Sequence, residues 1–343
     1  MKSLLRAVTA AALTLAALPV LAQDSRSLDL TVDGVGLSIG DSRRVTGVRL
    51  NFRDRYLEEV KGINATIWTP YEGSRGVVRG LALGLPATGA RRIEGIALGI
   101  VGLGAEETIR GIAIGGIGMG AGEDIRGLAI GGIGMGVGQD LRGIAIGGIG
   151  MGVGADLRGV GIGGIGLGVG GSSRGLLIGG IGAGVGGDME GVSIAGIGVG
   201  AGGNVKGLTI TGVGMGAGGD VTGVQLAGIG IGAGGTLKWV SIAGAGIGAP
   251  RIEGLAVAAG VGSENVHGVV IAPIYFKIAN GGRMRGLNIS AYNDIRGTQQ
   301  GLVIGLFNSA RTLDGLQIGI LNYAGNKSRG TRILPLFNYA RAR

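Results

Sequence analysis

The sequence predicts an all-β protein: a parallel β-solenoid of about twenty short, glycine-rich rungs with a dominant period of 16 residues. Three observations carry this prediction. Glycine fills 82 of 343 positions, far above its usual share. A 16-residue unit recurs along the chain, and apolar residues alternate with small ones inside it, which is the period of a β-strand. Collagen is excluded, because glycine does not fill every third position and only 6 prolines are present.

The repeat is clearest in two successive segments, IRGIAIGGIGMGAGED over 109–124 and IRGLAIGGIGMGVGQD over 125–140. A glycine follows the charged residue of each unit and serves as a marker, at Gly95, Gly111, Gly127, Gly143, Gly159, Gly175, Gly191, Gly207 and Gly223. Each column of equivalent places holds nearly one residue type. An up-and-down sheet would send equivalent places to opposite ends of neighbouring strands, so the pure columns favour a parallel coil.

Within a unit, the alternation changes phase at Gly115 and Gly116, where we expect a bend between two short strands. We expect a second bend at Glu123 and Asp124. The Ala113 column later holds Ser, Thr and Gln and is therefore expected to face outward. The bulky aliphatic columns are expected to stack inward as the core, namely Ile112, Ile114, Ile117, Ile130, Ile146 and Ile162.

Gly116, Gly118 and Gly120 belong to glycine columns that predict a strip without side chains and a candidate contact surface. Glycine in a strand is entropically unfavourable, so a steric need is the simplest reason to keep it. That need is either internal, at a cramped bend, or external, where a partner lies against the strip. We favour the internal explanation because the same run contains the phase change.

The chain divides into four segments by composition. Residues 1–22 are typical of a secretory signal peptide, with basic Lys2 and Arg6, an apolar run, and a cleavage site before Gln23. Residues 23–94 are predicted irregular N-terminal rungs with a cap, 95–250 the regular repeats, and 251–343 irregular C-terminal rungs with a cap. The signal predicts an exported protein of the periplasm, the outer-membrane surface or the extracellular space.

Charge is uneven along the chain, whose formal net charge is +9. Residues 251–343 hold 11 Lys and Arg against 4 Asp and Glu, together with most of the aromatic residues. Arg283, Arg285 and Tyr292 are therefore candidates for a basic, aromatic contact surface, whose alternative is a solvated cap. Nucleic acid is not an expected partner, because few aromatic residues interleave with these charges. The absence of Cys rules out disulfides and thiolate metal sites.

Asp124, Asp140 and Asp156 each end a unit and lie two residues before the Arg of the next one. Stacked turns would align the Asp residues in one file and the Arg residues in another. Successive residues of each file would lie about 4.8 Å apart along the rod. We interpret the files as neutralising each other and fixing the register. Calcium-binding β-rolls repeat every nine residues, whereas this period is 16, so we expect no calcium site.

Two matches to catalytic motifs are expected by chance in a chain this rich in glycine. Residues 161–166 match G-x-G-x-x-G, but no helix is expected after them. Residues 171–175 match G-x-S-x-G, but the single histidine, His267, is about six rungs away. We therefore expect no enzyme activity, cofactor, metal or small-molecule substrate.

The C-terminal units read GLVIGLFN from Gly301, GLQIGILN from Gly315 and LPLFN near the end, so that Asn308, Asn322 and Asn338 close their strands. Here the chain resembles the surface repeat proteins first named from Leptospira, whose units read GLQIGLxN, most closely over about residues 297–340. The regular middle departs from that pattern because it lacks the Asn. The resemblance implies an exported, envelope-associated repeat protein and assigns no catalytic residues.

These observations predict a non-catalytic structural or interaction rod at the bacterial cell envelope or surface. Envelope lipid, polysaccharide or a second copy of the chain are the partners we expect. The alternative is an outer-membrane β-barrel or pore-like protein, which the high hydropathy favours. Short strands and an aromatic content of 3% oppose that alternative.

Overall fold

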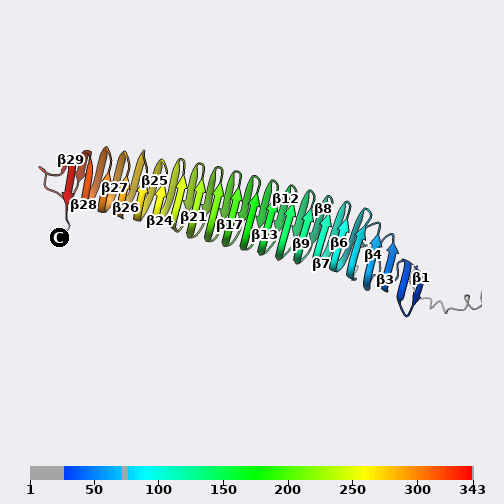
Figure 1. The fold of residues 1–343 in the computed structure, drawn as a ribbon. Helices are drawn as coiled ribbons and strands as arrows, with labels where there is room; N and C mark the ends of the chain where they lie inside the picture. The colour runs from blue at the N-terminus through cyan, green and yellow to red at the C-terminus, as the bar shows by residue number, and fades with distance from the viewer. Residues whose placement is uncertain (1–26, 72–75, 342–343) are drawn as a thin grey trace, which may run out of the picture.

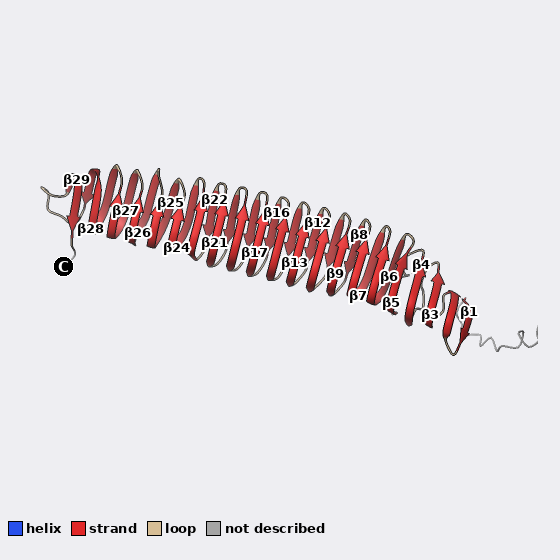
Figure 2. Cartoon of the chain, viewed as in Figure 1, coloured by secondary structure: helices blue, strands red, loops and turns tan. Residues whose placement is uncertain are grey.

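The computed structural model describes residues 27–71 and 76–341, in which every helix or strand element is a β-strand. The strands coil into a gently curved parallel solenoid of about 17 turns (Figures 1 and 2). The predicted fold class is confirmed. The count is below the predicted twenty, and the first and last strands pair antiparallel with their neighbours instead of adding parallel turns. The predicted signal peptide lies outside the described residues.

The chain has N-terminal strands, a regular middle in which long and short strands alternate, and C-terminal strands. The N-terminal strands are β1 (Ser27–Val32), β2 (Val35–Gly40), β3 (Arg44–Asn51), β4 (Glu59–Thr66), β5 (Val77–Gly84), β6 (Ala87–Gly99) and β7 (Gly102–Gly115). The regular long strands are β9 (Ile125–Gly131), β11 (Leu141–Gly147), β13 (Leu157–Gly163), β15 (Ser173–Gly179), β17 (Met189–Ala195), β19 (Val205–Thr211), β21 (Val221–Ala227) and β23 (Thr236–Ala243). The short strands between them are β8 (Gly118–Ala121), β10 (Gly134–Val137), β12 (Gly150–Val153), β14 (Gly166–Val169), β16 (Gly182–Val185), β18 (Gly198–Ala201), β20 (Gly214–Ala217) and β22 (Gly230–Ala233). The C-terminal strands are β24 (Gly246–Val257), β25 (Gly260–Ile271), β26 (Tyr275–Ile289), β27 (Tyr292–Ile304), β28 (Phe307–Ala324) and β29 (Ile333–Ala340).

Each regular turn contributes one long and one short strand, and equivalent residues stack on each other. Long strands pair in parallel with long strands, so that Arg142 lies beside Arg158. Short strands pair with short strands, so that Met135 lies beside Met151. The long and short strands thus form two layers, and the core lies between them.

The assignment of inward and outward columns from the sequence is wrong for the long strands and for the bend that follows each of them. Ile112, Ile114 and Ile117 are 40%, 37% and 50% exposed, whereas Ala113 is fully buried. Their equivalents in later turns, the predicted core residues Ile130, Ile146 and Ile162, are only half-buried.

The cause of this inversion is the marker glycine. Gly111 has a φ of 124°, in the region open to glycine, and so do the markers of the neighbouring turns. With the marker in this conformation, both of its neighbours, Arg110 and Ile112, lie on the outer side and Ala113 turns inward. The phase therefore changes at the marker as well as at the predicted bend.

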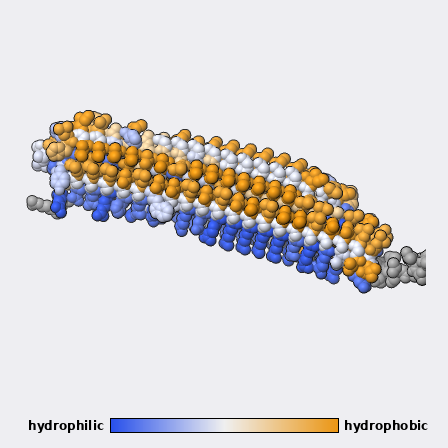
Figure 3. All heavy atoms as spheres, in the orientation of Figure 1, coloured by the Kyte–Doolittle hydropathy of each residue, from blue (hydrophilic) through white to orange (hydrophobic). Residues whose placement is uncertain are grey.

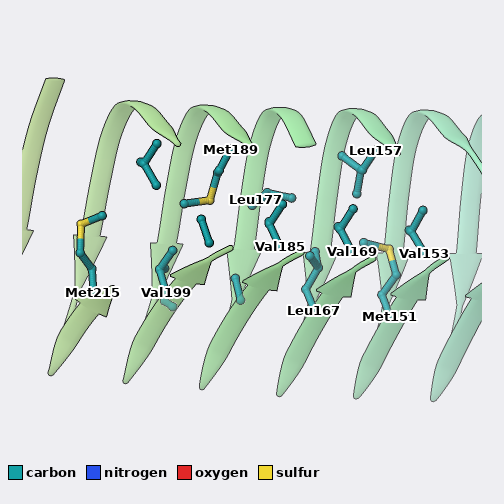
Figure 4. Close-up of a cluster of buried hydrophobic side chains, with 14 of the residues drawn as sticks. Met151, Val153, Leu157, Leu167, Val169, Leu177, Val185, Met189, Val199 and Met215 are labelled. Atoms are coloured by element: carbon teal, nitrogen blue, oxygen red, sulfur yellow. The ribbon is translucent and has the colours of Figure 1, made fainter. Parts of the chain in front are cut away.

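The core packs small residues of one layer against larger residues of the other. Met151, Leu157 and Leu167 meet between the layers (Figure 4), and all three are at most 5% exposed. A Cβ added at Gly161 would come within 2.9 Å of each of these side chains. One turn later Leu177 replaces this glycine and Ala183 replaces Leu167. The summed volume of the pair is thus nearly kept, as close packing requires.

The interior changes from apolar to polar toward both ends. At the N-terminal end the guanidinium of Arg49 is fully buried and donates to Asp54, to Asn64 at 2.9 Å and to Asp41 at 3.2 Å. At the C-terminal end Asn308 continues the column of Met151. Its amide accepts from Asn293 and donates to Asn322, both at 2.7 Å. Antiparallel pairs β1–β2 and β28–β29 close the two ends.

Candidate contact surfaces

Two outward aliphatic columns form a surface that we call the long-strand face. Pairing from β2 to β28 places Leu37 in the column of Ile112 and Ile39 in the column of Ile114. The same two columns end at Leu316 and Ile318. Every residue in both columns is Leu, Ile, Val or Ala, through regular and irregular turns alike. Figure 3 shows them as unbroken hydrophobic rows.

The terminal hairpins extend the long-strand face. Leu30 of β1 lies opposite Leu37 and is 60% exposed. Phe337 of β29 lies opposite Ile318 and is 63% exposed. The outward apolar character is therefore kept where the repeat itself is lost.

The bend that follows each long strand carries a third apolar column, which we call the apolar edge. In the regular turns its side chains are between 41% and 55% exposed, namely Ile117, Ile133, Ile149, Ile165, Ile181, Ile197, Val213 and Ile229. The bend amides are hydrogen-bonded to the preceding turn. Gly132 donates to Gly115 at 2.9 Å, and Ile133 and Gly134 donate to Ile117 at 2.6 and 3.2 Å.

The outward side of the short strands is bare and is named here the glycine face. The predicted contact residues of this strip, Gly116, Gly118 and Gly120, differ in how much space surrounds them. A Cβ at Gly116 would lie 1.9 Å from the carbonyl oxygen of Ile100, so this glycine is required inside the bend. A Cβ at Gly118 would meet its nearest atom at 3.7 Å, and one at Gly136 or Gly152 would meet nothing within 4 Å. The internal explanation is confirmed for Gly116 and is wrong for Gly118. At Gly120 the nearest atom lies at 3.3 Å, an intermediate case.

The remaining edge carries the charges of the regular turns and is named the charged edge. Arg126 pairs with Asp124 at 2.8 Å, and Arg142 pairs with Asp140 at 3.0 Å. Oδ1 of each Asp also accepts the backbone N–H one turn ahead, as in Asp156 with Ser172 at 2.9 Å. The interpretation of these files as neutralising and register-setting is confirmed, because each Asp links two turns.

The basic and aromatic candidates near the C-terminus do not form one surface. Arg285 pairs with His267 in the charged column, and Arg283 lies two residues before it on the same strand. Tyr292 instead continues the column of Gly118 on the other layer and stacks on Tyr275 with ring centroids 5.7 Å apart. Burial, and then the nearby carboxylate of Asp294, raise the pKa of Tyr275. The predicted joint surface is therefore wrong.

Trp239 is a further contact candidate, and it interrupts the series of marker glycines. It occupies the marker column between Gly223 and Gly254, with a φ of 83° that is unfavourable for a residue with a side chain. Lys238 of the charged edge precedes it, and Val240 of the long-strand face follows it. Its side chain is 66% exposed at the boundary between the two surfaces.

Within residues 27–71 and 76–341, no group of three His, Asp or Glu side chains is placed to hold a metal ion. No helix in the same residues is long and apolar enough to cross a membrane. No protein-family model, curated protein or solved structure matches the chain. The resemblance to the Leptospira surface repeat proteins stays a prediction.

Proposed function

We propose that this chain is a non-catalytic rod of the bacterial cell envelope, exported to the periplasm or surface, with a structural or interaction role. The observation that carries the proposal is the uniform exterior, in which the same outward columns run through all turns from β2 to β28. Enzymes gather a few convergent polar groups at one place, whereas this exterior repeats one pattern along its length.

The polar groups of the charged edge support the same proposal. Asp140 accepts the N–H of Asp156 and pairs with Arg142, so its carboxylate is engaged in holding turns together. Asn204 and Ser172 take over the same role in later turns, accepting the N–H groups of Asp220 and Asp188. These side chains serve the fold of the rod.

Export is tested with the full chain carrying a C-terminal tag in a Gram-negative host. We expect the chain in the envelope or periplasmic fraction, with Gln23 as its first residue by N-terminal sequencing. Leu13→Arg with Leu15→Arg interrupts the apolar run of the signal. This variant should accumulate uncut in the cytoplasm. Wild-type chain found uncut in the cytoplasm would contradict the proposal.

A pore-like role is the alternative, and its supporting observation is the apolar exterior. The interior opposes it, because the side chains of Met151, Leu157 and Leu167 fill the space between the layers (Figure 4). Conductance across a planar bilayer decides between the two roles. We expect no stepwise current from the purified chain, and discrete steps would favour the pore.

A further inference from the structure

We propose that the apolar edge and the long-strand face lie in the hydrocarbon of a lipid membrane while the charged edge remains in water. This inference rests on the envelope role proposed above and names the partner of that role. Its first ground is the extent of the apolar surface. At about 4.8 Å per turn and about 3.3 Å per residue, the surface from the Ile112 column to the Ile117 column measures about 80 by 20 Å. The largest apolar patch of an ordinary soluble protein is about 300–600 Å².

The second ground is the segregation of charge. In the units whose marker glycines run from Gly111 to Gly223, the twelve residues that begin with the marker, such as 127–138, contain no charged residue. All charges lie in the remaining four places, where Asp124 and Arg126 neutralise each other. A rod of this kind has one edge suited to water and an opposite edge suited to hydrocarbon, as in an amphipathic helix that lies in a membrane surface.

The third ground is the hydrogen bonding of the backbone at the apolar edge. An unpaired amide is costly in hydrocarbon, where no water can replace its partner. The bend amides of Gly148, Ile149 and Gly150 donate to the preceding turn at 2.9, 2.6 and 3.2 Å. Three bonds to the preceding turn recur at every bend from Gly116 to Gly230. The bend amides thus need no water.

The shape of the surface selects lipid over a second copy of the chain. Ile144 and Ile146 lie on the long-strand face, whereas Ile149 lies on the bend beside it, so the apolar surface wraps around a convex edge. A rigid copy packed on the flat face would leave the bend column in water. Fluid hydrocarbon covers the face and the edge together. It also covers the hollow of about 570 Å³ beside Leu50 and Ile67, where the Ile114 column holds the small residue Ala65.

Trp239 gives an independent indication of the water boundary. Tryptophan is enriched where a protein crosses from hydrocarbon to water. Trp239 lies at the corresponding boundary, between Lys238 and Val240, and holds a φ of 83° in a column otherwise filled by glycine. Backbone strain at an exposed residue points to a role outside folding.

The test is flotation with zwitterionic phosphatidylcholine vesicles, using the chain from residue 23 onward, which keeps every described residue. Ile133, Ile149, Ile165 and Ile181 are all replaced by Ser in one variant. The matched control replaces Gly136, Gly152, Gly168 and Gly184 by Ser, at positions where a Cβ meets no atom within 4 Å. We expect wild type and control to float in low and high salt, and the edge variant to bind at least tenfold less. Circular dichroism checks that all three are folded.

The second readout is tryptophan fluorescence, since the chain has only Trp68 and Trp239. In a Trp68→Phe chain, we expect vesicles to shift the emission of Trp239 to the blue and brominated lipid to quench it. A wild type that stays with the lipid-free fraction would overturn the proposal. So would a stable dimer that forms without lipid and whose assembly the edge variant abolishes, because a second copy would then cover the surface.

These vesicle measurements use purified chain and do not depend on export. If the chain floats but is never exported, the envelope role fails and the lipid-binding surface stands. If the chain is exported but does not float, the lipid proposal alone fails.

Discussion

The regular middle of the rod and its C-terminal end are built differently inside and alike outside. In the middle, Met151 and its equivalents form an apolar interior, whereas Asn308 occupies the same column near the end and hydrogen-bonds to two other Asn residues. The outward columns do not change in this way, because Ile144 of the middle and Leu316 of the end are both aliphatic. Either interior is compatible with the coil, so the fold alone does not require the outward columns to be aliphatic. We infer that the exterior of the rod has a separate role.

The largest effect is expected where a charge enters the narrow interior. Ala145→Asp places a carboxylate at a fully buried position and should lower the free energy of unfolding by about 4 kcal/mol or prevent folding. Ile144→Asp, at a position 45% exposed, should change it by less than about 1 kcal/mol. Chemical denaturation measures both variants. Equal losses would mean that the inward and outward columns are not distinct.

Replacement of glycine by alanine should lower the stability in the marker column and raise it on the glycine face. A Cβ at Gly143 lies 2.0 Å from the carbonyl oxygen of Gly127, at a φ of 133°, so Gly143→Ala should destabilise by about 3 kcal/mol. Gly152→Ala meets open space and should stabilise by about 0.5 kcal/mol through the unfolded chain. Thermal melting of the two single variants tests the pair. A damaging Gly152→Ala would show that the glycine face is needed for folding.

The hydrogen-bonded side chains of Asn293, Asn308 and Asn322 form an amide ladder at the C-terminal end. Substitution in this ladder should cost more stability than substitution in the equivalent column of the middle. Asn308→Leu leaves the amides of Asn293 and Asn322 without their partner and should cost about 2 kcal/mol. Met151→Leu changes only the shape of the side chain and should cost less than about 1.5 kcal/mol. Denaturation midpoints compare the two, and a neutral Asn308→Leu would mean that the ladder adds nothing to stability.

The smallest effect is expected on the charged edge. Asp140→Ala removes the acceptor for the N–H of Asp156 and should cost about 1 kcal/mol. Asp140→Asn keeps an acceptor oxygen, as Asn204 does three units after Asp156, and should be close to wild type. If both variants lost the same stability, the ion pair with Arg142 rather than the ladder would account for the loss.

The sequence was sufficient for the period, the parallel coil and the Asp–Arg pairing, because stacking makes equivalent residues neighbours. It was not sufficient to predict which side chains of the long strands point into the core. Strand alternation predicts inward Ile112 and Ile114 only if Gly111 has an ordinary strand conformation, whereas its positive φ reverses the alternation. Buried Ser193 and Gln225 then made an inward column look solvent-exposed. The sequence does contain a signal that the Ala113 column points inward. In the same turn a large residue, Leu177, enters the Ala113 column and a small one, Ala183, enters the Met119 column, as expected if the two columns pack against each other.

Cysteine reactivity tests the central claim, the outward aliphatic face, most directly, because the chain contains no cysteine of its own. Single variants Ile144→Cys, Ala145→Cys and Ile149→Cys are treated with a water-soluble maleimide in the folded state. We expect rapid labelling at positions 144 and 149, and labelling at 145 only after denaturant is added. Protected cysteines at 144 and 149 beside a reactive cysteine at 145, in a chain that is monomeric and free of lipid, would contradict the account.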